Sequence, residues 1–166
     1  MRIVEAVIGV NKDQRTKVVK KIEERLGPLE GKVIGVLGLS FKPNTSDVRE
    51  SPALDIVRSL LEQGAWVKAY DPEGMNEFKR FINDQALSFC SNPYEVAKKA
   101  EALVVVTEWN EFRNLDFARL KKLLARPVVI DSRNIYEPER MAELGFEYVG
   151  VGRGTNRQSG SREQKR

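Results

Sequence analysis

The chain has 166 residues, one cysteine and no histidine, and it carries 28 Lys and Arg side chains against 24 Asp and Glu side chains. This length fits one domain with short appendages, which can bury roughly 70% of the unfolded surface in a single core. One cysteine excludes an internal disulfide framework and fits the reducing cytoplasm, where we expect the protein to work. The lack of histidine excludes histidine triads, imidazole bases and histidine metal sites, and no metal is predicted.

The net positive charge gathers at the end of the chain. Residues 153–166 hold five basic side chains and one acidic side chain, which accounts for the whole excess of +4. Residues 1–152 are neutral and do not predict the continuous basic face that binds nucleic-acid phosphates. The segment 153–166 is poor in apolar side chains and is predicted to be a disordered basic tail. No apolar run approaches the ~18 residues of a membrane span, so neither nucleic acid nor a membrane is an expected partner.

The first 26 residues carry apolar side chains spaced by three and four, among them Val18, Ile22 and Leu26. This spacing predicts a helix. A Gly-Pro pair at residues 27–28 ends it, as such pairs commonly do. Because a short polar segment separates this helix from the next apolar run, residues 1–27 are predicted to be a connector that leads into the domain.

Residues 30–152 alternate between buried strands and amphipathic helices. Apolar runs predict six strands, at residues 32–39, 65–71, 86–91, 102–109, 127–132 and 146–152. Helical patterns lie between them, at residues 53–63, 75–83, 94–100, 116–125 and 139–144. Strands that alternate with crossover helices predict a mainly parallel sheet with helices on both faces. Right-handed crossovers then give a doubly wound, Rossmann-like α/β domain.

Ligands of such a sheet bind beyond the carboxyl ends of the strands, near the point where the strand order reverses. The loops to inspect therefore follow Leu39, Asp71, Ser91, Val106 and Asp131. All of these loops carry polar or aromatic residues. The sequence thus predicts that any binding site is assembled from loops that are distant along the chain.

The loop after the first strand has two glycines, Gly35 and Gly38, whose spacing is a degenerate form of the dinucleotide fingerprint G-x-G-x-x-G. Tight turns also require glycines, so this spacing is weak evidence. Lys42 follows on a loop that Pro43 stiffens, among small polar residues. Its ammonium group suits a phosphate or a sugar hydroxyl, and it can equally be a solvated lysine.

Arg49 precedes a predicted helix start, with Ser51 as the N-cap and a proline after it. The positive end of that helix favours an anion, to which Arg49 could donate hydrogen bonds. A salt bridge of Arg49 with Asp47 or Glu50 is the alternative. Arg133 reaches the same edge from a different loop, and basic groups from two loops suggest a ligand with several negative or polar groups.

Other residues have a structural alternative to a binding role. Asp71 ends the second strand, where an acid either binds a ribose or closes an ordinary turn. Trp109 and Phe112 can wall a pocket, although packing over the sheet edge is favoured. Cys90 lies on an apolar strand without a catalytic partner, which favours a structural thiol over a nucleophile.

Several motifs together resemble one known family. In chain order from about Val10 to Arg153 they read VNKDQ, GLSFKPNTSDVRESP, AYDPEGM, ALVVVTEWNEF, VVIDSRNIYEPERM and LGFEYVGVGR. They resemble the C-terminal part of the UDP-glucose 6-dehydrogenase family, within the UDP-glucose/GDP-mannose dehydrogenase superfamily. Motifs in this number and order are far more specific than any one loop.

The resemblance implies a function and a set of site residues. Family members have an N-terminal NAD-binding domain, a helical connector that dimerises and a C-terminal Rossmann-like domain that holds UDP. They oxidise UDP-glucose to UDP-glucuronate with two NAD. Phe41 and Lys42 match positions that contact UDP-glucose, Arg133 matches an arginine that reaches the substrate, and Arg49 matches one that touches NAD.

The sequence also departs from the family pattern. The NAD-binding domain and the catalytic cysteine have no counterpart here, and Cys90 does not match that cysteine, so this chain alone is expected to be inactive. Its partners would be those missing domains and a second copy in a homodimer. Ser132 stands where many relatives have glycine. A UDP-N-acetylmannosamine or GDP-mannose dehydrogenase domain, or a stand-alone nucleotide-sugar sensor, remain alternatives.

Overall fold

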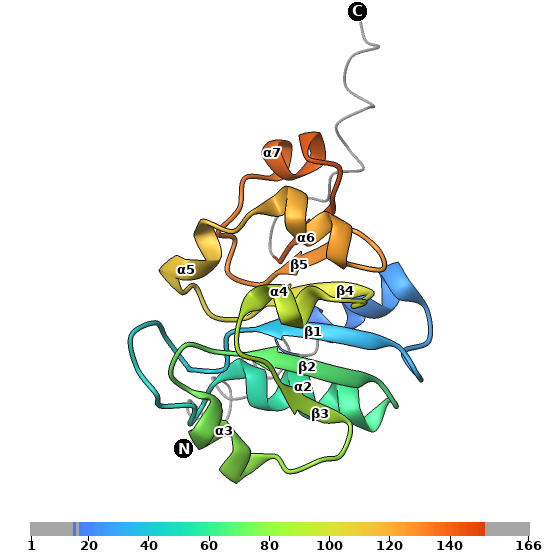
Figure 1. Cartoon of the computed structure of the whole chain (residues 1–166). Helices are drawn as coiled ribbons and strands as arrows, with labels where there is room; N and C mark the ends of the chain where they lie inside the picture. The colour runs from blue at the N-terminus through green and yellow to red at the C-terminus, as the bar shows by residue number, and fades with distance from the viewer. Residues whose placement is uncertain (1–14, 16, 152–166) are drawn as a thin grey trace, which may run out of the picture.

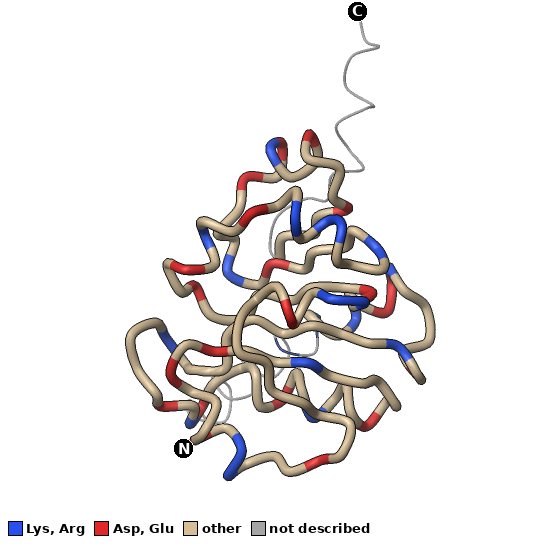
Figure 2. Tube along the Cα trace, in the orientation of Figure 1, with Lys and Arg blue, Asp and Glu red and all other residues tan. Residues whose placement is uncertain are grey.

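The computed structural model describes residue 15 and residues 17–151 (Figure 1). The first half of the predicted connector and the predicted tail at residues 153–166 lie outside the described residues. Basic and acidic residues are interspersed along the described part of the chain, as expected of a segment without net charge (Figure 2). In that part, no helix is both long and apolar enough to cross a membrane.

A six-stranded sheet in the order β3-β2-β1-β4-β5-β6 forms the centre of the domain (Figure 1). Its strands are β1 (Val33–Leu37), β2 (Trp66–Tyr70), β3 (Leu87–Phe89), β4 (Ala102–Val105), β5 (Val128–Asp131) and β6 (Glu147–Gly150). All paired strands are parallel, with Ile34 opposite Val67 on one side and Ala102 on the other. The predicted doubly wound, Rossmann-like fold is confirmed, and the strand order reverses between β1 and β4.

The helices confirm the predicted alternation. They are α2 (Pro52–Glu62), α3 (Met75–Phe81), α4 (Pro93–Ala97), α5 (Asn110–Arg113), α6 (Phe117–Leu123) and α7 (Pro138–Glu143). Ser51 caps α2 as predicted, because its side chain accepts a hydrogen bond from the backbone N–H of Ala53. Only α5 was not predicted, since four residues are too few to show helical periodicity.

Two hydrophobic clusters pack on opposite faces of the sheet. Ile34 and Val36 of β1 join α2 and α3 in one cluster, whereas Leu37 joins α4, α6 and α7 in the other. This alternation along β1 is the two-residue period of a strand that is buried on both faces. The sheet therefore has helices on both sides, and its carboxyl edge carries the loops that can bind a ligand.

Residues 17–26 of the predicted connector are helical and pack against the sheet. Val18, Ile22 and Leu26 are buried in the same cluster as the apolar residues of α2. Arg25 in this helix forms an ion pair with Glu147 of β6. The described part of the connector thus belongs to the core of the domain, and it brings residue 15 to the carboxyl edge.

Gly38 makes the turn after β1 possible. Its φ angle is +98°, and a Cβ atom at this position would lie 2.5 Å from the backbone nitrogen of Thr107. The Thr107 hydroxyl donates a hydrogen bond of 2.6 Å to the carbonyl oxygen of Ser40. The loops after β1 and β4 are therefore in direct backbone contact, and no side chain fits between them.

We expect Gly38→Ala to destabilise the fold by roughly 3 kcal/mol or more. The energetic cost of a left-handed conformation for alanine adds to the cost of the steric overlap between its Cβ atom and the backbone of Thr107. Gly31→Ala is the matched control, since Gly31 has a φ angle of +76° and a Cβ atom added there would meet nothing within 4 Å. This control should cost about 1 kcal/mol. Urea unfolding of both variants measures the difference, and equal losses would contradict the close approach.

Candidate functional site

The loops after β1, β2, β4 and β5 meet at the carboxyl edge of the sheet, at the left of Figure 1. The longest of them, residues 38–51, is called the β1 loop here and carries Phe41, Lys42 and Arg49. The loop after β5 carries Arg133. All four residues that the resemblance assigned to ligands therefore lie at the edge where Rossmann-like sheets bind them.

A buried carboxylate holds three of these loops together. Asp71 is fully buried, and its two oxygens accept hydrogen bonds of 2.7 to 3.0 Å from five N–H groups. The donors are the backbone N–H groups of Leu39, Ser40, Glu73 and Gly74 and the Trp109 indole, while the single proton of the Ser40 hydroxyl is shared between Asp71 Oδ1 at 3.0 Å and the carbonyl oxygen of Thr45 at 2.8 Å. A carboxylate has about four lone-pair positions, so these donors saturate it. Of its two predicted roles, the structure therefore favours the turn, because donors within the protein already occupy the oxygens that a ribose would need.

Asp131, at the end of β5, holds a loop in the same way on the other side of the strand-order reversal between β1 and β4. It is fully buried and accepts hydrogen bonds from the backbone N–H groups of Arg133, Ile135 and Tyr136 and from the Tyr148 hydroxyl. The loop that carries Arg133 is thereby fixed to the sheet. In the sequence, Asp131 is recognisable as a strand end, and the signal for its further role is an acid that precedes a polar Ser-Arg-Asn turn.

Ser132 and Asn134 define the rest of this loop. The Ser132 hydroxyl donates a hydrogen bond of 2.7 Å to the carbonyl oxygen of Val105, which ties the loop to β4. Asn134 adopts the left-handed conformation, with a φ angle of 55°, which asparagine tolerates better than most residues. Serine in place of the family's glycine is therefore compatible with a well-bonded loop.

Trp109, Phe112 and Cys90 have structural roles. Trp109 is buried, with 7% of its surface exposed, and its indole N–H donates a hydrogen bond to Asp71. Phe112 is fully buried, so both rings pack over the sheet edge, as the sequence favoured. Cys90 packs partly buried against the second cluster, and burial raises the pKa of its thiol. A raised pKa disfavours the thiolate, which is the reactive form.

Phe41 and Lys42 are displayed at the outer part of the β1 loop. The Phe41 side chain is 41% exposed, and the Lys42 ammonium lies 5.2 Å from the centre of its ring. The Phe41 backbone N–H donates to the carbonyl oxygen of Asp47 at 3.0 Å, which folds the loop back on itself. An exposed aromatic ring beside a cation can contact a base or sugar together with a phosphate.

Arg49 pairs with Asp47 through two hydrogen bonds. Its Nε donates to Asp47 Oδ1 at 3.1 Å and its Nη2 to Oδ2 at 3.0 Å, and the side chain is 77% exposed. Hydrogen bonds from the Arg49 side chain and backbone lower the pKa of the Asp47 carboxyl, and the pair raises the pKa of Arg49. Of the two salt bridges predicted as alternatives, the one with Asp47 is present. In this pair two hydrogen bonds orient the guanidinium, which stays exposed at the surface.

Arg133 pairs with Glu108 in the loop after β4. Its Nε donates to the Glu108 carboxylate, while its backbone N–H is held by Asp131. The Arg133 side chain is 44% exposed, so it is anchored at one nitrogen and still accessible. Glu108 is a site residue that sequence reasoning missed, because the two residues are far apart along the chain.

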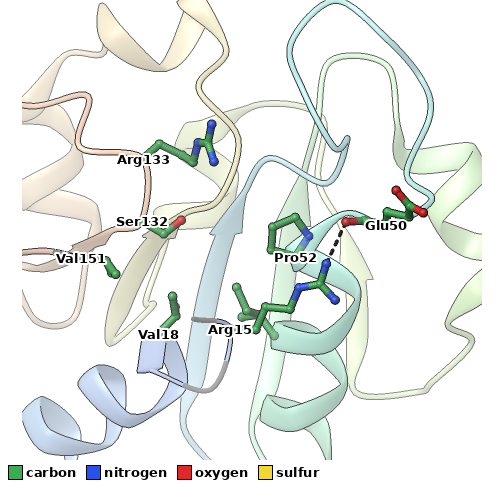
Figure 3. A pocket seen from close by; sticks show the side chains of 8 residues that line it. Arg15, Val18, Glu50, Pro52, Ser132, Arg133 and Val151 are labelled. Atoms are coloured by element: carbon green, nitrogen blue, oxygen red, sulfur yellow. Dashed lines mark hydrogen bonds between the residues drawn. The ribbon is translucent and has the colours of Figure 1, made fainter. Parts of the chain in front are cut away.

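Residues that the structure describes line two hollows at this edge. The larger, about 370 Å³, has Ser132, Arg133 and Val151 on one side and Arg15, Glu50 and Pro52 on the other, with Val18 and Ile56 completing the lining (Figure 3). The smaller, about 260 Å³, is lined by Phe41, Asp47, Arg49 and Glu50. Arg133 and Phe41 thus line different hollows, and Glu50 lies in the wall of both. The larger volume falls in the range of small-ligand sites.

These features define a Rossmann-like α/β domain whose candidate binding site lies on loops at the carboxyl edge of the sheet. Among the residues that the structure describes there is no cluster of acidic or cysteine ligands for a metal ion. Residues 35–138 match the family model described as the UDP binding domain of the UDP-glucose/GDP-mannose dehydrogenase family. The chain belongs to this family.

Known relatives agree with this assignment. Over 154 residues the chain is 45% identical to a UDP-glucose 6-dehydrogenase of Rhizobium meliloti (strain 1021), covering 92% of this chain and 35% of the relative. A UDP-glucose 6-dehydrogenase of Bacillus subtilis (strain 168) is 40% identical, with 92% and 33% covered. The chain thus spans about a third of the length of the curated relatives it matches.

Solved structures give the same result. A UDP-glucose dehydrogenase from Pyrobaculum islandicum superposes with a TM-score of 0.77 at 35% identity, covering 93% of this chain and 33% of that structure. An NDP-N-acetyl-D-galactosaminuronic acid dehydrogenase from Methanosarcina mazei superposes with a TM-score of 0.68 at 30% identity, with 84% and 28% covered. The matched region is therefore one part of longer dehydrogenases.

Replacing Asp71 by asparagine should destabilise the domain by roughly 3 kcal/mol or more, because an amide nitrogen cannot accept the donors that face it. Asp84→Asn is the control, since the exposed Asp84 accepts one hydrogen bond, from the backbone N–H of Ala86, and asparagine can accept it equally. Its effect should stay within about 0.5 kcal/mol. Chemical denaturation measures both, and a neutral Asp71→Asn would contradict the saturated carboxylate.

The Asp47 carboxyl should titrate below its ordinary pKa of 3.8 in a carbon-detected NMR titration. Its pairing with Arg49 is then complete above that ordinary pKa and is lost as the pH falls through the lowered pKa. Arg49→Gln should raise the pKa of Asp47 back toward 3.8. The Glu95 carboxyl, whose pKa is lowered by hydrogen bonds from Ser91, should not respond. An Asp47 pKa unchanged by Arg49→Gln would contradict the pairing.

Proposed function

We propose that this chain is the nucleotide-sugar-binding part of a UDP-glucose 6-dehydrogenase and that it holds the UDP moiety at the carboxyl edge of its sheet. The observation that carries this proposal is the arrival of Phe41 and Lys42 from the β1 loop, and of Arg133 from the loop after β5, on either side of the reversal between β1 and β4. That reversal is the usual ligand position in such sheets.

The chemistry of these residues suits a nucleoside diphosphate sugar. Lys42 and Arg133 supply positive charge for phosphate or hexose oxygens, and each charge-assisted hydrogen bond contributes about 1.5 to 3 kcal/mol. Anchoring of Arg133 Nε by Glu108 limits the side-chain freedom that binding would otherwise remove. The exposed Phe41 ring offers an apolar surface to the base or sugar.

The rest of the activity belongs to the longer enzyme that we propose this chain to be part of. There UDP-glucose is oxidised to UDP-glucuronate in two steps, each of which transfers one hydride to an NAD, and water supplies the second carboxylate oxygen. In this proposal Arg49, which is paired with Asp47, faces the NAD that another domain holds. The connector helix contributes to a homodimer, and the enzyme works in the cytoplasm. The residues described here bind and orient the substrate, and we assign none of them a catalytic role.

A stand-alone nucleotide-sugar sensor would use the same residues, because Phe41, Lys42 and Arg133 all lie in this chain. A UDP-N-acetylmannosamine or GDP-mannose dehydrogenase domain would differ in the base or sugar that it prefers. UDP-glucose is favoured because the relatives compared above at 45% and 40% identity are UDP-glucose 6-dehydrogenases. Titration with UDP-N-acetylmannosamine and GDP-mannose beside UDP-glucose separates the three nucleotide-sugar preferences.

Arg133→Ala should weaken UDP binding about tenfold or more in calorimetric titration, because one charge-assisted contact is worth at least a factor of ten. Arg80→Ala is the matched control, since Arg80 is a 76% exposed arginine on α3 that pairs only locally with Glu77. Its Kd should equal that of the unaltered chain. An Arg133→Ala variant with an unchanged Kd would remove Arg133 from the site, and a chain that binds no UDP would contradict the proposed function.

A further inference from the structure

Arg15 connects the helix before the domain to the end of the β1 loop. Its Nη2 donates a hydrogen bond of 2.9 Å to the carbonyl oxygen of Glu50, drawn as the dashed line in Figure 3. Its Nη1 forms an ion pair with the Asp55 carboxylate in the first turn of α2. One guanidinium thus contacts both sides of the junction between the β1 loop and α2, from a position 35 residues earlier in the chain than Glu50.

Glu50 is the residue at which this junction is least favourable. Its φ angle is 61°, in the left-handed region that glutamate rarely adopts. Such a conformation persists only where surrounding contacts hold it. The next residue, Ser51, caps α2, and its backbone N–H donates to the carbonyl oxygen of Val48 at 3.0 Å. The Arg15 hydrogen bond therefore acts on the residue that sets the direction of the loop.

A chain of contacts leads from Glu50 to the outer part of the β1 loop. Its neighbour Arg49 makes the paired hydrogen bonds with Asp47, and the carbonyl oxygen of Asp47 accepts the backbone N–H of Phe41. Glu50 itself lines both hollows of the site. A change at Glu50 is therefore expected to reach Phe41 and Arg49 through direct bonds.

We infer that Arg15 is a positioning residue, which holds Glu50 in its left-handed conformation and so fixes the β1 loop for ligand binding from the helix that precedes the domain. The identity of the ligand in this inference rests on the proposed function. The hold of Arg15 on Glu50 and Asp55, called the clamp here, does not. Docking of the connector helix and the shape of the ligand loop are then coupled. Arg15 also lines the larger hollow, so direct contact with the ligand is the competing role, and the experiment must separate the two.

Hydrogen exchange of the full chain without ligand tests the clamp. Arg15→Ala should increase amide exchange in residues 41–51 and leave residues 102–105 of β4 unchanged. Arg58→Ala is the matched control, because Arg58 is an exposed arginine of α2 whose side chain, within the described part of the chain, donates one long hydrogen bond of 3.4 Å to the carbonyl oxygen of Phe81. It should not change exchange in residues 41–51. Unchanged exchange in Arg15→Ala would overturn the inference, whether or not UDP binds.

Binding of UDP to a double-mutant set separates positioning from direct contact. Arg15→Ala should weaken UDP binding about threefold to tenfold, because the loop then leaves its binding conformation part of the time. Glycine adopts positive φ angles freely, so a Glu50→Gly variant does not need Arg15 to hold residue 50 in the left-handed conformation. In that background Arg15→Ala should therefore weaken UDP binding by less than about twofold. An equal loss in both backgrounds would assign Arg15 to ligand contact and overturn the positioning role. If the unaltered chain binds no UDP, the proposed function fails and hydrogen exchange alone judges the clamp.

Discussion

The buried carboxylate of Asp71 is the interaction on which the site depends. Burial of a charge costs several kcal/mol unless hydrogen bonds compensate it, and here five N–H donors from three loops do so. One of these loops continues directly from Ser40 into Phe41 and Lys42. The position of Phe41 and Lys42, the predicted binding residues of this loop, is therefore set by an acid that is itself fully buried.

The same solution occurs on the other side of the sheet reversal, where Asp131 holds the backbone of the loop that carries Arg133. Each half of the site is thus a basic residue on a loop whose backbone N–H groups bond to a buried acid at a strand end. The contact of Gly38 with Thr107 joins the two halves at the centre of the edge. Rigid loops lower the entropy that is lost when a ligand binds, which favours a pre-formed site.

The sequence predicted the fold better than the site. Six apolar runs and five amphipathic segments determine the layers, because period-two and period-3.6 patterns report burial directly; the four-residue α5 is too short for such a pattern. Site roles depend on contacts between distant residues. Three examples are the hydrogen bond from Trp109 to Asp71, the pairing of Arg133 with Glu108, and the hydrogen bond from Arg15 to Glu50. Each joins residues at least 25 positions apart along the chain, so none of them can be read from a local pattern. The binding roles of Phe41, Lys42 and Arg133 came from the family resemblance, and they stay predictions.

The most direct test of this account is a titration of the isotope-labelled chain with UDP, followed by the backbone amide signals in two-dimensional NMR spectra. The account predicts that signals from residues 38–51 and 132–136 shift together with a single dissociation constant, while signals at the amino ends of the strands, such as those of Lys32 and Trp66, stay in place. Shifts confined to the amino ends, or no shifts at millimolar UDP, would contradict a nucleotide-sugar site at the carboxyl edge of the sheet.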